Sequence, residues 1–249
     1  MFRVINLDEQ FLINNLWVII AALLVFIMTV AVGFLEVGEL GSSIKRSLFK
    51  TILISGTSLF VMGIIGFNPG SVLAFNGETL VVVINTFLAA GTAMLSTIGF
   101  RWIDSKRYPD ILDSVNGILM GLIIITPLAG FVSPVSSIIL GFLGGPLFIY
   151  AEKTLSKIKW MDDPVGLLPG HATGGLFGVV MIAFFTQKIF ASASGNPTLP
   201  NGLLFGGGYL AVKQLGIEFF GIVVVIIFVF VVSYFCLWVI GKVSGGITY

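Results

Sequence analysis

The only histidine of the chain, His171, lies inside an apolar segment and is the residue best suited to chemistry. An imidazole has an unperturbed pKa of about 6.5, so it can relay a proton or hydrogen-bond a small polar molecule near neutral pH. Ionisable residues inside membrane segments are costly, and they usually face a cavity or a partner. The structural alternative is a buried neutral imidazole that bonds a backbone carbonyl.

The residues before His171 predict an irregular or delayed start of its helix. Two prolines and two glycines crowd this stretch: Pro164, Gly166, Pro169 and Gly170. Irregular backbone is tolerated at membrane depth only where protein or a cavity covers it. Asp162 and Asp163 stand before the first proline, which favours a helix cap over a solvated pair that balances nearby lysines. In neither case are they a catalytic carboxylate pair.

Small and polar residues elsewhere are interpreted first as packing elements. Gly174, Gly175 and Gly178 follow His171 at helical spacing and permit close approach of another helix, which we favour over direct contact with a ligand. Polar residues within apolar runs are expected to form hydrogen bonds between helices; they are Asn85, Asn116 and Thr126. Asn68 belongs to a predicted turn. Glu36 and Glu39 close the first apolar run and are expected to be interfacial and solvated.

The composition excludes a water-soluble enzyme. Of the 249 residues, 57% are hydrophobic and 10% charged, with a mean hydropathy of +1.07, whereas soluble domains carry roughly a quarter charged residues. A net charge of +1 leaves no basic surface for nucleic acid. With the single cysteine Cys236 there is no intrachain disulfide and no cysteine metal cluster. No nucleophile elbow, phosphate-binding loop or zinc-binding motif occurs, so we expect no enzyme, no cofactor and no metal.

The elements that position these residues are predicted to be seven transmembrane helices in a single all-α domain that covers residues 1–249. Their approximate ranges are 16–35, 51–67, 79–100, 112–130, 135–151, 164–186 and 215–240. Near-unbroken apolar runs favour helices over the alternating segments of a β-barrel. No cleavage site follows the first residues, so we expect no removable signal peptide. The link 187–212 is expected to be a surface loop, ordered or mobile.

The basic residues predict the orientation of these helices. Ten of the thirteen fall on one side: Lys45, Arg46, Lys50, Arg101, Lys106, Arg107, Lys153, Lys157, Lys159 and Lys242. Only Arg3, Lys188 and Lys213 fall on the other side. Because basic residues concentrate in cytoplasmic loops, the N-terminus is expected outside and the C-terminus on the cytoplasmic, matrix or stromal side. The sequence does not say which membrane holds the protein.

Several motifs resemble those of the ammonium transporter (Amt/Rh) family, in the same order along the chain. The run DDPVGLLPGHATGGLFG resembles the family's tenth helix, and SGTSLFVMGIIGFNPGS resembles the sixth. VVVINTFLAAGTAML looks like the seventh helix, ILMGLIIITPLAGFVSP like the eighth, and the last span like the eleventh. AVGFLEVGELGSSIK looks like the end of the first. The chain therefore resembles a shortened member, with helix one joined directly to helices six through eleven.

The resemblance implies a fold and a set of site residues. Full members have eleven helices built around two inverted repeats, and the conducting path runs between the repeats past a histidine from each half. Only the second histidine, His171, is present here, which implies that it lines the path of conduction. Ser55, Asn68, Asp163, Gly174, Gly175 and Gly178 are the residues expected to support the pore or its helices. Gly166 replaces the family's acidic residue, and Leu53 and Ile54 stand where a gate phenylalanine is expected.

Two functions stay open at this point. The first is a transporter or channel for ammonium or ammonia, formed as a homotrimer or with a partner chain that supplies the missing helices. The second is a non-conducting structural subunit derived from such a transporter, docked in a larger membrane complex. In either case loss of the first repeat is expected to expose the glycine face of residues 174–178 and to direct His171 away from its own bundle, near mid-membrane. A covering partner, besides lipid, is then needed.

Overall fold

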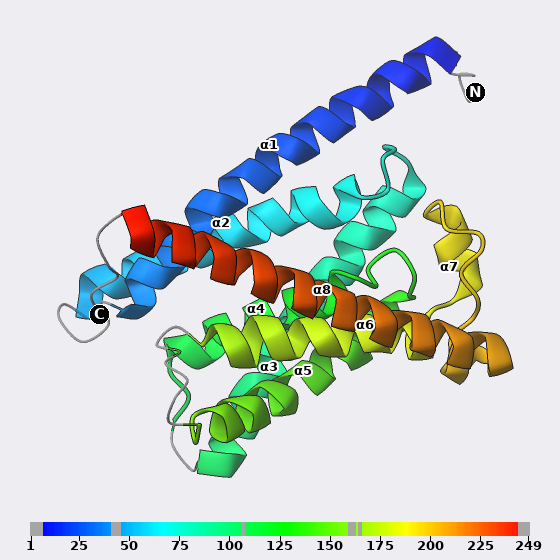
Figure 1. Cartoon of the computed structure of the whole chain (residues 1–249). Coiled ribbons are helices and arrows are strands. Elements are labelled where there is room, and N and C mark those ends of the chain that lie inside the picture. The colour runs from blue at the N-terminus through cyan, green and yellow to red at the C-terminus, as the bar shows by residue number, and fades with distance from the viewer. Residues whose placement is uncertain (1–6, 41–45, 106–107, 159–162, 164–165, 244–249) are drawn as a thin grey trace.

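The computed structural model describes residues 7–40, 46–105, 108–158, 163 and 166–243, and within these ranges the chain is helical without any strand. Figure 1 shows the arrangement. The elements in chain order are α1 (Leu7–Leu40), α2 (Arg46–Gly70), α3 (Gly77–Ser105), α4 (Ile111–Ile125), α5 (Pro134–Leu155), η1 (Leu168–Ala172), α6 (Thr173–Phe185), α7 (Lys188–Ala193), η2 (Leu203–Phe205) and α8 (Gly208–Val243).

Each predicted transmembrane segment corresponds to an apolar helix. Six of the described helices are long and apolar enough to cross a membrane, and α4 is a shorter apolar helix of 15 residues. The chain is thus the all-α, multi-pass membrane protein that the sequence predicts. Several helices extend beyond the predicted ranges, most clearly α1 and α8. The link 187–212 contains the short helix α7, the turn η2 and the beginning of α8.

The helix α4 ends at Ile125, five residues before the prediction, because Pro127 has no backbone N–H with which to continue the helical hydrogen bonds. The non-helical chain that follows is buried, with Leu128 and Val132 fully enclosed. Side chains from other elements satisfy its carbonyl groups. Asn85 Nδ2 donates to the carbonyl oxygens of Ala129 and Val132, both at 2.8 Å. Irregular backbone in this apolar chain is therefore covered and hydrogen-bonded, as its environment requires.

The helices α1 and α2 pack closely along a line of glycines on α2. A Cβ atom built on Gly56 would lie 2.8 Å from the backbone nitrogen of Leu35, and one on Gly70 would lie 2.6 Å from Cβ of Ala21. Gly63 and Gly66 face Met28 and Leu24 in the same way. Because only glycine permits this approach, the small residues fix the register of the pair.

A second packed unit joins α3, α4, α5 and α6. Its core includes Met120, Ile124 and Leu140, none of which is exposed. Gly141 and Gly145 on α5 lie against α3, where the backbone nitrogen of Gly145 donates to Ser96 Oγ at 3.1 Å. This unit holds the helix that carries His171.

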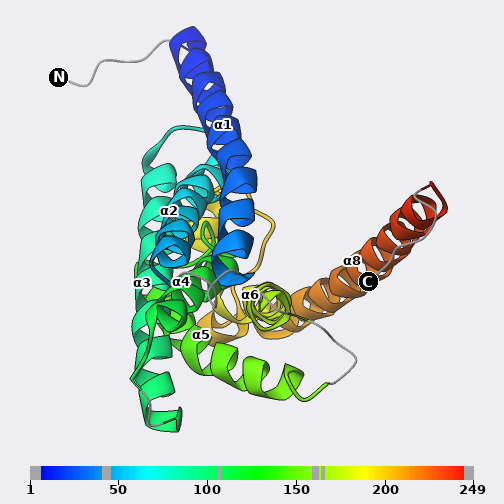
Figure 2. The ribbon, with the colours of Figure 1, turned by 90° about the vertical axis from the view of Figure 1, so that its left-hand side faces the viewer.

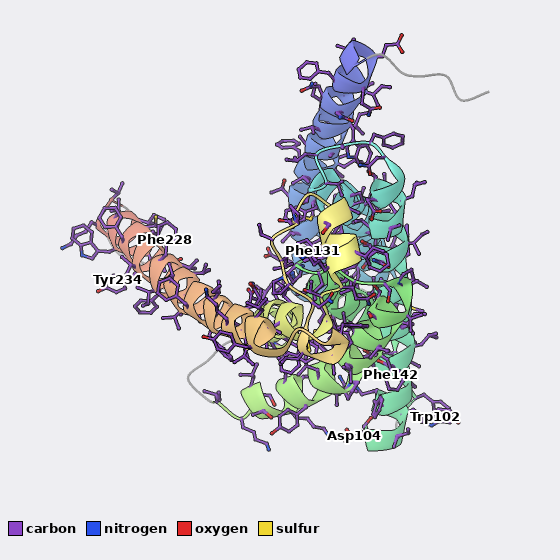
Figure 3. All side chains as sticks on the ribbon, turned by 90° about the vertical axis from the view of Figure 1, so that its right-hand side faces the viewer. Trp102, Asp104, Phe131, Phe142, Phe228 and Tyr234 are labelled. Carbon is purple, nitrogen blue, oxygen red and sulfur yellow. The ribbon has the colours of Figure 1, made fainter. Side chains whose placement is uncertain are left out.

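The helix α8 extends away from this bundle (Figure 2). No residue in its most apolar stretch is buried inside the described chain. Figure 3 shows Phe228 and Tyr234 on the part of α8 that is separated from the other helices. A helix that is apolar on all sides is stable only inside protein or lipid.

An ion-pair network joins α3, α4 and α5 at one end of the bundle. Arg101 Nε lies 2.8 Å from Asp113 Oδ1, and Arg101 Nη2 lies 2.6 Å from Glu152 Oε2. The sequence assigns Arg101 to a loop between spans, whereas it is a buried part of α3. Lys213 likewise lies within α8 and not in a loop.

Other residues named above lie outside the described ranges: Arg3, Lys45, Lys106, Arg107, Lys159, Asp162 and Pro164.

Candidate functional site

His171 lies on a single π-helical turn, η1, that leads directly into α6. The hydroxyl of Thr173 donates to the carbonyl oxygen of Leu168 at 3.1 Å and braces this turn. Turns of this kind inside helices occur frequently at functional sites. The prolines and glycines before His171 therefore accompany a local irregularity, as the sequence predicts.

Asp163 anchors the start of this helical segment. Its Oδ1 accepts from the backbone nitrogen of Leu167 at 2.9 Å, and its Oδ2 accepts from that of Leu168 at 2.8 Å. These bonds satisfy amide groups that have no partner within the first helical turn. Gly166, which lies between Asp163 and Leu167 in the chain, has φ +68°, a left-handed conformation that glycine adopts without strain. The carboxylate thus has the capping geometry that Asp before Pro predicts.

The ring of His171 faces Phe60 of α2. The two ring centroids are 6.3 Å apart and the planes are inclined at 84°, which is an edge-to-face arrangement. Phe60 is buried, whereas the side chain of His171 is exposed on the described chain. His171 is therefore not enclosed by its own bundle, and it stands at the edge of the packed core.

His171 lines a pocket of about 40 Å³ between α1, α2, α4, α5 and η1. A volume of this size holds a small molecule comparable to water. Most of the wall is apolar, and it includes Phe60, Leu119 and Phe148. Three of the lining residues have polar side chains: Glu36, Asn116 and His171. The pocket is thus a small, mainly apolar site with three side chains capable of hydrogen bonding.

The neighbours of His171 place it at mid-level in the bundle. It is only the fourth residue of the apolar segment Leu168–Phe185. However, its partner Phe60 lies near the middle of the segment Leu48–Gly70, and Asn116 and Leu119 lie near the middle of α4. The helix that carries His171 therefore begins deep between the other helices.

Two of the three expected glycines pack inside the bundle, and the expectation that loss of a repeat exposes the whole glycine face is wrong for them. Gly174 and Gly178 are buried against α4, and a Cβ on Gly178 would lie 2.5 Å from the carbonyl oxygen of Ile124. Only Gly175 has open space beside it. The reason is that α4 occupies this face, which helical spacing alone does not reveal.

The two expected residues on α2 lie apart from the pocket. Ser55 is exposed and does not line it. Asn68 is buried near the far end of α2, where its Nδ2 donates to Thr86 Oγ1 at 3.1 Å. Asn68 thus joins α2 to α3, and its place in the structure is that of a packing residue.

Sequence reasoning did not assign three of the pocket residues to the site. Phe60 carried no signal beyond its place in an apolar run. Asn116 was expected to bond another helix, but it lines the pocket. Glu36 was expected to be solvated at the membrane interface, and although exposed it also lines the pocket. Its acidic side chain within an otherwise apolar helix was the signal that could have identified it.

Comparison with known proteins supplies the family. The model of the Ammonium Transporter Family matches residues 43–248. The chain is 34% identical to the ammonium transporter of Bacillus subtilis over 193 residues, which is 78% of this chain and 45% of that protein. It is 28% identical to ammonium transporter Amt2 of Archaeoglobus fulgidus over 193 residues, covering 77% of this chain and 40% of that one.

The fold shows the same similarity. The crystal structure of Mep2 from Candida albicans superposes with a TM-score of 0.68 at 26% identity, covering 78% of this chain and 42% of that one. The chain therefore spans less than half the length of each of these relatives.

Proposed function

The chain belongs to the ammonium transporter family, and we propose that it conducts ammonium or ammonia across a membrane along a path that passes His171. The observation that carries this proposal is the mid-level pocket, which lies within the matched region and contains the only histidine of the chain. The named relatives are transporters, which supports a transport protein over an enzyme.

The pocket suits a small permeant that leaves its water behind. Apolar constrictions in channels exclude hydrated ions, and the walls around His171 are mainly apolar. A neutral imidazole offers one donor and one acceptor, so it can hydrogen-bond ammonia or accept a proton from ammonium. Asp163 contributes by fixing the helical turn on which the imidazole stands.

Conduction requires a second protein surface beside His171. The side chain is exposed on the described chain, and α8 is unburied throughout its apolar stretch. We infer that another copy of this chain, in a homotrimer, or a different membrane subunit covers this side. Membrane lipids surround the assembly. The N-terminus lies outside and the C-terminus on the cytoplasmic or equivalent side, because most basic residues fall on the side of the C-terminus.

Proteoliposomes test this function directly. The purified intact assembly is reconstituted, and an imposed ammonium gradient is followed by current and by internal pH. We expect a response that empty liposomes do not give, and no response to a potassium gradient of equal size. If the intact assembly gives no flux, the transport proposal is rejected, and a non-conducting structural subunit of a larger membrane complex becomes the better account.

A further inference from the structure

We propose that Glu36, together with Asn116 and His171, forms a binding site for a small ammonium cation on one side of the His171–Phe60 contact. This inference rests on the proposed function and adds the residue that attracts the cation. Among the described residues, Glu36 is the one acidic side chain that lines the pocket.

Glu36 is an exposed acidic side chain near the C-terminal end of an apolar helix. It lies inside the apolar segment Glu9–Gly38 of α1, where a carboxylate needs a partner or a polar cavity. Within the described part of the chain, neither an ion pair nor a side-chain hydrogen bond involves Glu36. Among the described residues no cation pairs with the Glu36 carboxylate, so this group of the pocket wall is open to a cation from outside.

The packing of α1 on α2 places Glu36 relative to His171. Leu35 lies against Gly56 of α2, which is four residues before Phe60. The two helices run antiparallel, so Glu36 is level with the residue before Gly56, and at 1.5 Å per residue it is roughly 7–8 Å from the level of Phe60. The displacement is toward the end of the bundle where α2 and η1 begin. In the proposed orientation this end faces the cytoplasm or its equivalent.

The donor and acceptor chemistry of the three groups matches an ammonium ion. Such a cation carries up to four N–H donors and no acceptor. The Glu36 carboxylate, the Asn116 carbonyl oxygen and an unprotonated imidazole nitrogen are acceptors. Hard metal cations such as K⁺ need a fuller shell of oxygen ligands, which the apolar remainder of the wall does not supply. The site therefore favours ammonium and methylammonium over K⁺.

Thermal unfolding of the purified full assembly in detergent measures this binding without any flux. The midpoint is recorded against ammonium chloride, with potassium chloride at equal ionic strength as the reference, because a ligand of the folded state raises the midpoint. We expect ammonium to raise the midpoint of the wild type above that in potassium. In Glu36→Gln, the ammonium concentration that gives half of the maximal rise in midpoint should be about tenfold higher, as expected for loss of one charge-assisted hydrogen bond.

The same helix provides a matched control. Glu9→Gln removes an exposed carboxylate from the other end of α1 and should leave the ammonium effect unchanged. Glu36→Asp keeps the charge and should restore most of the effect, which separates loss of charge from damage to folding. Two results would overturn the proposal. Either ammonium does not raise the unfolding midpoint of the wild type above that in potassium, or it raises the midpoint of Glu36→Gln at the same concentrations as in the wild type.

The result is distinguishable from failure of the proposed function. If liposomes show no flux but Glu36 governs the ammonium effect, the binding site stands and transport is rejected. If flux is present and Glu36→Gln binds ammonium like the wild type, transport stands and this site is rejected.

Discussion

His171 and Phe60 meet edge to face in the wall of the pocket, although they are 111 positions apart in the sequence. Phe60 is packed into the core, whereas His171 is exposed. The phenyl ring thus forms a packed wall beside the exposed imidazole.

Replacing Phe60 should alter size selection. Phe60→Leu retains an apolar wall but enlarges the pocket and removes the aromatic contact. We expect methylammonium transport to increase relative to ammonium by up to about tenfold, the scale on which pockets discriminate single methyl or methylene groups. The ratio of the two fluxes in proteoliposomes measures this change. An unchanged ratio would show that Phe60 does not limit the passage.

Removing the cap at Asp163 should loosen the turn that carries His171. Asp163→Ala deletes both acceptors for the backbone amides of Leu167 and Leu168, at an expected cost of about 1 kcal/mol. Hydrogen exchange should then be faster at these two amides than in the wild type. Asp163→Asn retains one acceptor and should give an intermediate rate. Equal protection in the wild type and the alanine variant would contradict the capping role.

Two glycines of α6 should respond differently to the same substitution. Gly178→Ala places a methyl group against the backbone of Ile124, so we expect destabilisation of about 1–3 kcal/mol. Gly175→Ala meets open space and should be neutral or stabilising by about 1 kcal/mol through helix propensity. Thermal unfolding in detergent compares them. Similar losses at both positions would mean that Gly175 is also packed, against a subunit that the single chain does not contain.

The buried ion pair of Arg101 with Asp113 should stabilise the fold more than the partly exposed pair of Lys153 with Asp104. Among the described residues, Asp113→Ala leaves the buried Arg101 guanidinium with Glu152 as its remaining ion-pair partner. It also removes one of the two acceptors in the capping box of α4, so we expect a loss of about 3–5 kcal/mol. Asp104→Asn breaks a partly exposed pair with Lys153 and should cost less than about 1 kcal/mol. Unfolding midpoints in detergent give the comparison, and comparable effects of the two changes would refute the ranking.

Local sequence signals predicted local structure well. Unbroken apolar runs predicted every membrane helix, and Asp before Pro predicted the cap at the start of η1, because both depend on neighbouring residues. Contacts between distant segments were not predictable in this way. Arg101 pairs with Asp113 and Glu152, which lie 12 and 51 positions away. Likewise, the packing of Gly178 on α4 and of His171 on Phe60 depends on how whole helices are placed.

The measurement that tests the account most directly is ammonium flux through the reconstituted assembly of His171→Ala. Leu176→Ala is the matched control, because this exposed residue lies on α6, directly after the turn that carries His171, and outside the pocket. We expect wild-type and Leu176→Ala assemblies to conduct alike, while His171→Ala changes the ammonium-driven current and internal pH response. Flux that is identical in all three would remove His171 from the conduction path and contradict the central claim.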